Sequence, residues 1–421
     1  MKKLLTLLLV CSIFAGSIYA GGFQLNEQGA RAMAMAGAFT GLANDPSAIY
    51  FNPAGITQLS GTNFSLGTTM ILPLAKFNLP QPNNSQTDMD SQVFTLINFY
   101  LTHAFSEKLS VGIGINNQFG LGTRWNPNWI GRKLAVETSV KAFTLTPVLA
   151  YKLFKNFSVS AGPTISMAKV KITQKSSNPN PTQPEPLITL ESVYATAVGF
   201  TAGILYKLND MWQFGLSYRS ESKYSLTGTV ASDPSTFVHP LLHIGLPFPN
   251  GTISAPLTTP QSATLGIAWM PDKDWTATFD FQFVGWSSYD NLTVTFDNYD
   301  LDLNPANGTQ NVETIPRNYK DTYIARLGFE YKASENFAVR FGLLYDHNPV
   351  PDEYVEPTLP DADRLGFNIG FGGKLTEHLG VDFSYMYLSF NDRIVQYSKF
   401  GFNGTYSNSA HLFGFNLNYS L

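Results

Sequence analysis

The sequence predicts an all-β membrane protein: a 14-stranded antiparallel barrel of the outer-membrane type, with a small N-terminal α-helical hatch in its lumen. Aromatic residues make up 14% of the 421 residues, the same share as charged residues, whereas a soluble domain carries about 25% charge. Long segments alternate apolar with polar residues, and tight turns between them alternate with long loops. After the N-terminus, no segment has the ~18–20 consecutive apolar residues of a membrane-spanning helix. These features favour strands as the membrane-crossing elements.

Residues 1–20 have the pattern of a secretory signal peptide. Two lysines precede an apolar run over residues 4–14, and Ala20 is followed by two glycines. A charged start, a short apolar core and a small residue at the cleavage point define such peptides, so we expect cleavage after Ala20. A membrane anchor is the alternative, but the run is short for one. The only cysteine, Cys11, lies in this peptide, so we expect neither disulfides nor thiol chemistry in the mature chain.

Residues 21–59 form the predicted hatch. The part over residues 29–42 is rich in Ala, Met and Gly with a single charge, which predicts a short, tightly packed helix. Asp45-Pro46 ends it, and Asn52, Pro53, Ala54 and Gly55 form a turn signal. Small side chains suit a confined space, so we expect this segment to plug the lumen. A disordered leader is the alternative, which these apolar residues disfavour: Phe23, Ile49, Tyr50, Phe51, Ile56 and Leu59.

Residues 60–421 form the predicted barrel wall. Over residues 275–283 and 413–421, apolar and polar side chains alternate, as on a strand with one oily face. In lipid every backbone group must be paired, so such strands must close into a barrel. Six tight turns are expected at 106–108, 155–156, 209–210, 271–274, 334–336 and 376–378, and seven long loops at 74–90, 121–132, 174–188, 232–259, 298–317, 347–363 and 391–405. They join 14 strands, with both chain ends on the side of the tight turns.

The mature chain resembles, over its whole length, the FadL family of outer-membrane transporters for long-chain fatty acids and other hydrophobic compounds. The start at residues 22–27 and the Asn52-Pro53-Ala54 turn are similar to family segments. Further similar segments follow in the family's order: Tyr218-Arg219-Ser220-Glu221, Tyr319-Lys320-Asp321, Pro349-Val350-Pro351, Pro360-Asp361-Ala362-Asp363-Arg364 and Leu412-Phe413-Gly414. Residues 129–132 resemble the branch that includes aromatic-hydrocarbon transporters. No single motif is specific, but their joint order is.

The resemblance implies capture of the ligand at an outer groove, binding in a pocket above the hatch, and sideways release into the membrane through a kink in the third strand, which the Asn-Pro-Ala turn contacts. Here the third strand is expected over residues 109–124. Asn116, Asn117, Gly120 and Gly122 interrupt its alternation, as residues at a bulge or kink do. The alternative is that these glycines begin the second outer loop.

Two sets of ligand-binding candidates follow. The loop over residues 232–259 is unusually apolar, which favours a capture site, although it could fold over the barrel mouth for packing only; its candidates are Phe237, Leu241, Leu242, Ile244 and Phe248. The resemblance implies that basic side chains in the lumen hold a carboxylate, with Lys320 at one family position and Lys169 and Lys171 near another. Lys320 could instead pair with Asp321 within a polar lumen.

The sequence indicates no catalytic residues, cofactor or metal site. No Gly-x-Ser-x-Gly motif stands beside a suitable histidine, and scattered basic residues with a net charge of −4 give no nucleic-acid footprint. The resemblance implies a monomer in the outer membrane of a Gram-negative-type cell, in contact with membrane lipid, that passively moves a fatty acid or similar hydrophobic molecule. Uptake of aromatic or alkane hydrocarbons is the alternative, and a general porin is a more distant one.

Overall fold

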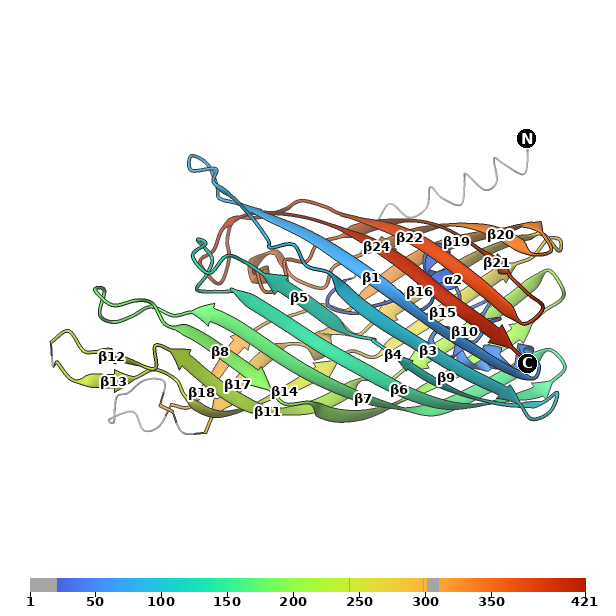
Figure 1. Ribbon diagram of the computed structural model, residues 1–421, viewed down its shortest axis with the longest axis horizontal. Coiled ribbons are helices and arrows are strands. Elements are labelled where there is room, and N and C mark those ends of the chain that lie inside the picture. The colour runs from blue at the N-terminus through green and yellow to red at the C-terminus, as the bar shows by residue number, and fades with distance from the viewer. Residues whose placement is uncertain (1–20, 242, 298, 301–309) are drawn as a thin grey trace.

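The protein forms a closed barrel of 14 antiparallel strands in the computed structural model, which describes residues 21–421 except 242, 298 and 301–309. The first and last strands close the ring along their length, from Asn63 opposite Ser420 to Asn78 opposite Thr405. The predicted signal peptide lies outside the described residues. Figure 1 shows the tilted strands, with tight turns at the end where the chain terminates and longer loops at the other end.

Eight wall positions are continuous strands and six are interrupted. The continuous strands are β1 (Thr62–Asn78), β3 (Phe94–Ala104), β6 (Glu137–Phe154), β7 (Phe157–Lys175), β20 (Phe337–Asp346), β21 (Arg364–Lys374), β22 (Leu379–Phe390) and β24 (Gly404–Ser420). The interrupted positions are β4 (Leu109–Asn116) with β5 (Gly120–Arg124), β8 (Leu187–Ser192) with β9 (Ala195–Lys207), β10 (Trp212–Arg219) with β11 (Ser222–Asp233), β14 (Gly251–Thr259) with β15 (Ser262–Trp269), β16 (Trp275–Val284) with β17 (Asn291–Phe296), and β18 (Val312–Pro316) with β19 (Thr322–Ser334).

In the described part of the chain, four short strands lie outside this count. β2 (Gln86–Asp88) and β23 (Arg393–Val395) extend the pairing of β1 and β24. β12 (Thr236–Val238) and β13 (Gly245–Pro247) form a separate hairpin at the far loop end (Figure 1). All six predicted tight turns fall between consecutive wall strands. The strand number predicted from turns and loops is therefore confirmed.

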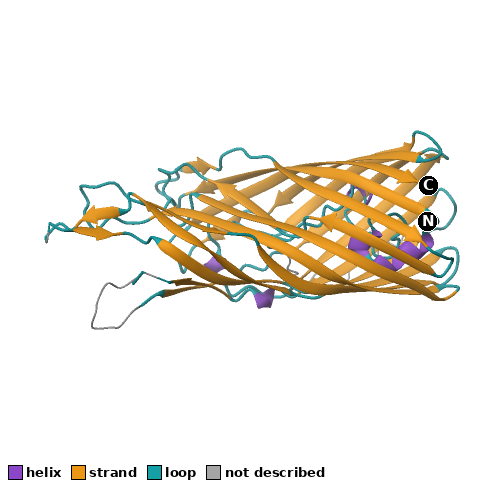
Figure 2. Cartoon of the chain, turned by 60° about the horizontal axis from the view of Figure 1, so that its bottom comes forward, coloured by secondary structure: helices purple, strands orange, loops and turns teal. Residues whose placement is uncertain are grey.

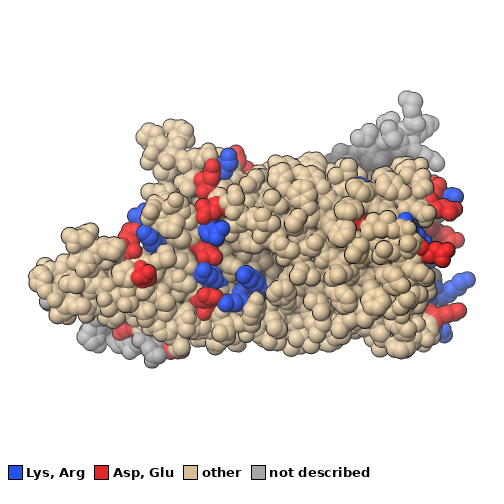
Figure 3. All heavy atoms as spheres, viewed as in Figure 1, with Lys and Arg blue, Asp and Glu red and all other residues tan. Residues whose placement is uncertain are grey.

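The wall has an apolar outer face. On β16, Phe279, Phe281 and Phe283 are exposed, whereas Asp280 and Gln282 between them are buried. Burying the polar face and exposing the oily one is the reverse of a soluble sheet, and it suits a barrel whose outer surface meets lipid. Figure 3 shows charged side chains gathered in a band near the loop end and at the turn end, with few between.

The N-terminal segment (residues 21–59) is mostly buried and has strands around it, near the turn end of the barrel (Figure 2). Its helical parts are α2 (Ala30–Ala34), α3 (Ala48–Phe51) and the 3-10 turn η1 (Pro53–Gln58); the loops carry η2 (Trp286–Ser288) and η4 (Asp352–Tyr354). The helix predicted over residues 29–42 is wrong in its length, because Ala36 and Gly37 adopt φ values of 57° and 76° that end α2 early. Within the described residues, no helix has the length and apolar character needed to cross a membrane.

Candidate functional site

The third wall position is broken, and the break leaves part of its neighbour unpaired. β4 ends at Asn116 and β5 begins at Gly120. β3 pairs with β4 only from Phe99 onward, and β5 pairs with β6 alone. Among the described residues, the outer half of β3 (residues 94–98) therefore has β1 on one side and no ladder partner on the other. The interruption predicted near residues 116–122 is thus a gap in the wall between β3 and β5.

A side chain bridges this gap at its inner end. The Asn117 amide oxygen accepts a hydrogen bond from the Ile97 backbone N–H on β3 at 2.9 Å, and its amide nitrogen donates to the Ala142 carbonyl on β6 at 2.8 Å. Asn117 therefore replaces the missing backbone ladder with two side-chain hydrogen bonds. Its neighbour Asn116 makes a weaker contact, 3.4 Å from its amide nitrogen to the Tyr100 hydroxyl.

The N-terminal segment covers the free edge of the broken strand. The Leu25 N–H donates to the Gln118 carbonyl at 2.9 Å, and the Gly120 N–H donates to the Phe23 carbonyl at 3.0 Å. Gln24 forms an isolated antiparallel bridge with Phe119. These three residues thus act as a short added strand at the break. The predicted contact of the Asn-Pro-Ala turn with the kink stays a prediction. The turn at Pro53–Gln58 lies against β4, and the Asn52 side chain donates hydrogen bonds to the carbonyls of Thr40 and of Ile204 on β9.

An apolar cavity of about 500 Å³ lies beside the break. Its lining includes side chains from the inner face of the wall, such as Leu96 and Ala142, which are buried. It also includes Leu74 and Phe143, which are exposed on the outer face. The cavity therefore borders both faces of the wall, on both sides of the gap. A volume of several hundred Å³ with a mostly apolar lining is typical of small-molecule sites.

Among the residues that the structure describes, the charged ones lining this cavity are Glu27, Lys141, Asp361 and Arg364. The Arg364 guanidinium donates to Asp346 at 2.7 Å and lies over the Phe390 ring, 5.5 Å from its centroid. The Asp361 carboxylate accepts a hydrogen bond from the Gly22 N–H. Asp361 lies in the loop between β20 and β21, and its burial raises its pKa to about 6. Arg364 is the cation at the inner part of the cavity.

The lysines predicted for the lumen lie elsewhere. Lys169 and Lys171 on β7 flank Val170, which packs inside the barrel, so strand alternation directs both lysines to the outer face. There Lys169 pairs with Glu191 at 2.6 Å and Lys171 with Glu137 at 2.8 Å. The lumen position expected for these two lysines is therefore wrong.

Lys320 also stands apart from the cavity. Its side chain is exposed and is absent from the cavity lining, and its backbone N–H donates to the Pro349 carbonyl. Sequence analysis did not single out Arg364, although it lies in one of the family-like segments. Lys141, which lies on the same strand face as Phe143, was not among the predicted site residues either.

The outer-loop candidates lie at the far hairpin formed by β12 and β13. Phe237 and Phe248 are buried and their rings pack 5.0 Å apart. Leu241 and Ile244 are exposed, with 82% and 50% of their surface accessible. Leu242 lies outside the described residues. The hairpin thus presents isolated apolar side chains at its tip above a packed aromatic pair.

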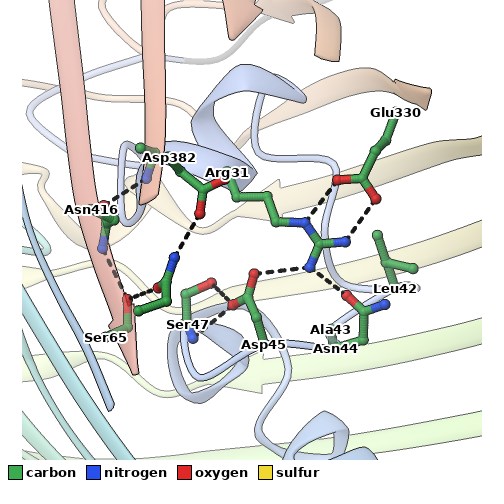
Figure 4. A network of polar contacts seen from close by, with 12 residues as sticks. Arg31, Leu42, Ala43, Asn44, Asp45, Ser47, Ser65, Glu330, Asp382 and Asn416 are labelled. Carbon is green, nitrogen blue, oxygen red and sulfur yellow. Dashed lines mark hydrogen bonds and ion pairs between the residues drawn. The ribbon is translucent and has the colours of Figure 1, made fainter. Parts of the chain in front are cut away.

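A polar network ties the N-terminal segment to the wall (Figure 4). The Arg31 guanidinium makes two hydrogen bonds to the Glu330 carboxylate, both at 2.9 Å, and an ion pair with Asp45 at 3.2 Å. Glu330 also accepts from Arg340 at 2.6 Å, and Arg340 reaches Asp382 at 2.6 Å. Acidic and basic groups therefore alternate along one chain of contacts from the segment into β19, β20 and β22.

Comparison with known proteins shows the family to which this barrel belongs. A closed barrel with an apolar outer belt is the architecture of an integral outer-membrane protein. Residues 11–421 match the family described as "Outer membrane protein transport protein (OMPP1/FadL/TodX)", and the chain belongs to this family. The protein is therefore an outer-membrane transport-family protein, as the sequence predicted.

Relatives and solved structures agree with this assignment. The chain is 24% identical to the long-chain fatty acid transport protein of Escherichia coli, over 97% of this chain and 96% of that protein. It is 24% identical to outer membrane protein P1 of Haemophilus influenzae over the full length of both. The crystal structure of a Pseudomonas aeruginosa FadL homologue superposes with a TM-score of 0.78 at 21% identity, covering 96% of this chain and all of that one. The Ralstonia pickettii toluene transporter TbuX superposes with a TM-score of 0.69 at 16% identity, covering 94% and 99%.

Proposed function

We propose that the protein passively carries long-chain fatty acids or similar hydrophobic molecules across the outer membrane and releases them sideways into the bilayer. The observation that carries this proposal is the cavity bordering both faces of the wall at the break between β3 and β5. A long acyl chain gains about 0.8 kcal/mol per CH₂ on leaving water. A route from an oily hairpin through an apolar cavity into lipid retains that gain, whereas a route ending in water forfeits it.

In this proposal the N-terminal segment is a hatch that closes the lumen. Its buried small residues and its bonds to strands around the ring support a plug rather than a mobile leader. Ligand meets the exposed apolar tip of the outer hairpin, enters the cavity, and leaves where Phe23, Gln24 and Leu25 cover the broken strand. Release requires these three residues to move off the edge of β5. The protein works as a monomer surrounded by membrane lipid.

Within the cavity, Arg364 is the residue we assign to a carboxylate. It is the only cation that reaches the cavity from the inner side among the described residues. Its guanidinium binds Asp346 through one oxygen and leaves donors available. Uptake of toluene-like hydrocarbons is the second candidate function, supported by the largely apolar lining, since a neutral cargo needs no cation.

A fluorescence titration tests the binding site. Oleate and toluene are titrated into purified wild type, Arg364→Lys, Arg364→Gln and the matched control Lys320→Gln. Oleate affinity that falls in the Gln variant at 364, partly recovers in the Lys variant and stays unchanged in the 320 variant supports the assignment. Loss of oleate affinity in the 320 variant alone would return the carboxylate site to Lys320. Toluene binding without oleate binding favours the hydrocarbon function, and binding of neither contradicts the transporter proposal.

A disulfide lock tests the exit. Gln24 and Phe119 face each other in an antiparallel bridge, which is a spacing that a disulfide can span. The double variant Gln24→Cys/Phe119→Cys is assayed for oleate transfer in proteoliposomes, oxidised and reduced, beside each single variant. We expect transfer to stop on oxidation and return on reduction. Undiminished transfer by the oxidised protein would show that the segment need not leave the strand edge.

A further inference from the structure

Lys141 lies on the outer face of the wall at the mouth of the cavity. It is exposed, whereas its neighbour Ala142 is buried in the interior cluster that contains Phe23. Alternation along β6 therefore directs the Lys141 side chain outward. In the strand pairing, Lys141 lies opposite Gly120 on β5 and opposite Lys169 on β7.

The strand paired with Lys141 offers no side chain of its own at the neighbouring positions. β5 places only glycine opposite it and opposite Ser139, namely Gly120 and Gly122. At these two positions an added Cβ would lie 2.7 Å from a Leu25 methyl carbon and 1.9 Å from the Phe94 ring. The side chains of Leu25 and Phe94 therefore occupy this space, and Lys141 lines the cavity together with them.

Lys141 has no carboxylate bound directly to it among the described residues, although its charge acts on Glu191, which Lys169 binds. Lys141, Lys169 and Lys171 form a group of outward-facing lysines. The other two members have carboxylate partners: Lys169 pairs with Glu191, and Lys171 with Glu137. Among the described residues, no ion pair within 4.0 Å is formed by Lys141. The group therefore carries one excess positive charge, located at the cavity mouth.

Lys141 also marks the edge of the apolar belt. Toward the turn end of β6, its face continues with Phe143, Leu145, Pro147 and Leu149, of which Phe143 and Leu149 are exposed. Toward the loop end, the residues on its face are Ser139 and Glu137. A lysine at such a boundary buries its stem against oily neighbours and keeps its ammonium at the level of the lipid headgroups.

We propose that Lys141 is an exit-side anion site that receives the carboxylate of the cargo after its acyl tail has entered the bilayer. The inference rests on the proposed sideways release. An acyl tail can pass the gap alone, but a carboxylate that leaves Arg364 crosses an apolar cavity, where an unpaired charge is costly. A free ammonium at the outer mouth gives that carboxylate its next partner, at the height where a fatty acid headgroup rests in a bilayer. Neutral cargo gains nothing from it.

Transfer rates of oleate and of oleyl alcohol, which has the same tail without the charge, test this site. Both are measured in proteoliposomes for wild type, Lys141→Gln, Lys141→Arg and the control Lys171→Gln, whose lysine faces outward but does not line the cavity. We expect Lys141→Gln to slow oleate about tenfold, since a hydrogen bond to a charged group is lost. Oleyl alcohol should be unaffected, Lys141→Arg should retain the oleate rate, and Lys171→Gln should behave as wild type.

Equilibrium oleate affinity of each variant, from the fluorescence titration, shows whether the fold and inner site are intact. An unchanged oleate rate in Lys141→Gln, or equal slowing of oleate and oleyl alcohol, overturns the exit site. The disulfide lock at residues 24 and 119 separates the two proposals. If the lock stops both cargoes while Lys141→Gln has no effect, only the exit site fails. If the lock stops neither, sideways release itself fails.

Discussion

Replacing Arg31 by methionine should weaken the attachment of the N-terminal segment to the wall. The substitution keeps a long apolar stem but removes two hydrogen bonds to Glu330, each at 2.9 Å, and the ion pair to Asp45 at 3.2 Å. The side chain of Arg31 is 18% exposed and that of Glu330 only 3%, so solvent replaces little of what is lost. The buried carboxylate keeps one partner, Arg340 at 2.6 Å.

The structure sets the size of this effect. Removing one partner of a buried ion pair costs about 3–5 kcal/mol when the other charge is left alone. Because Glu330 retains Arg340, we take the lower end, about 3 kcal/mol, which is a factor of roughly 100 in the equilibrium between attached and detached segment. Other bonds hold the segment in place: Asp280 accepts from the Phe39 and Thr40 N–H groups, and Asn416 accepts from Ala30. We therefore expect brief openings rather than a permanently open barrel.

Single-channel conductance in planar bilayers measures those openings, and thermal melting in detergent measures the stability. We expect Arg31→Met to show transient ion conductance and a lower melting temperature. Arg132→Met is the matched control, because Arg132 makes a bidentate pair with Glu185 in the outer loops, where the side chains are 28% and 25% exposed, and such pairs contribute about 1 kcal/mol or less. Silent bilayers and an unchanged melting temperature for Arg31→Met would refute the reasoning that this network closes the barrel.

Three further predictions concern the cavity and its approaches. Asn117→Ala removes both hydrogen bonds that bridge the wall gap and should lower the melting temperature, because each group left unpaired costs about 1–3 kcal/mol. Asn116→Ala should destabilise the protein less than half as much. Equal melting temperatures for the two variants would contradict the bridging role of Asn117. Asp361→Asn keeps an acceptor for the Gly22 N–H, and because burial raises the pKa of Asp361 to about 6, ionisation disfavours the folded state increasingly as pH rises from about 4 through 6. The variant should therefore melt like wild type at about pH 3, below both pKa values, and higher than wild type at pH 8. A lower melting temperature than wild type at pH 8 would mean that the charge itself is needed. Leu241→Asp, at the exposed hairpin tip, should slow oleate capture without changing affinity at equilibrium, and an unchanged uptake rate would remove the hairpin from the route.

The wall could be predicted from the sequence because its determinants are local. Tight polar turns and strand alternation are short-range patterns, and they gave the strand number that the structure has. The interruption at residues 116–122 was visible for the same reason, since consecutive asparagines and nearby glycines break the period of two. The packed helix over residues 29–42 was overestimated because positive φ values at Ala36 and Gly37 depend on tertiary packing that a composition argument does not contain.

The charged residues of the site were harder to place because their positions depend on which strand face meets lipid. Lys169 has the same parity on β7 as Met167, which is exposed on the outer face, so the alternation already contained the signal that this lysine points outward. Arg364 and Gly22 both line the cavity, although they are more than 300 positions apart in the sequence. No local pattern encodes that meeting.

Charge, rather than apolar area, decides between the two cargo classes. For a fatty acid and a hydrocarbon of equal length, each CH₂ gains the same ~0.8 kcal/mol from the cavity lining, so this contribution cancels in the comparison. The remaining difference is the cost of taking a carboxylate out of water, which must be met by donors at each stage of the route. The cavity has a cation at its inner side, Arg364, and another at its outer mouth, Lys141. Arg364 pairs with Asp346 but keeps further donors available, and Lys141 binds no carboxylate directly among the described residues; a neutral cargo would use neither group. The placement of these two cations therefore favours an anionic, long-chain cargo over a hydrocarbon.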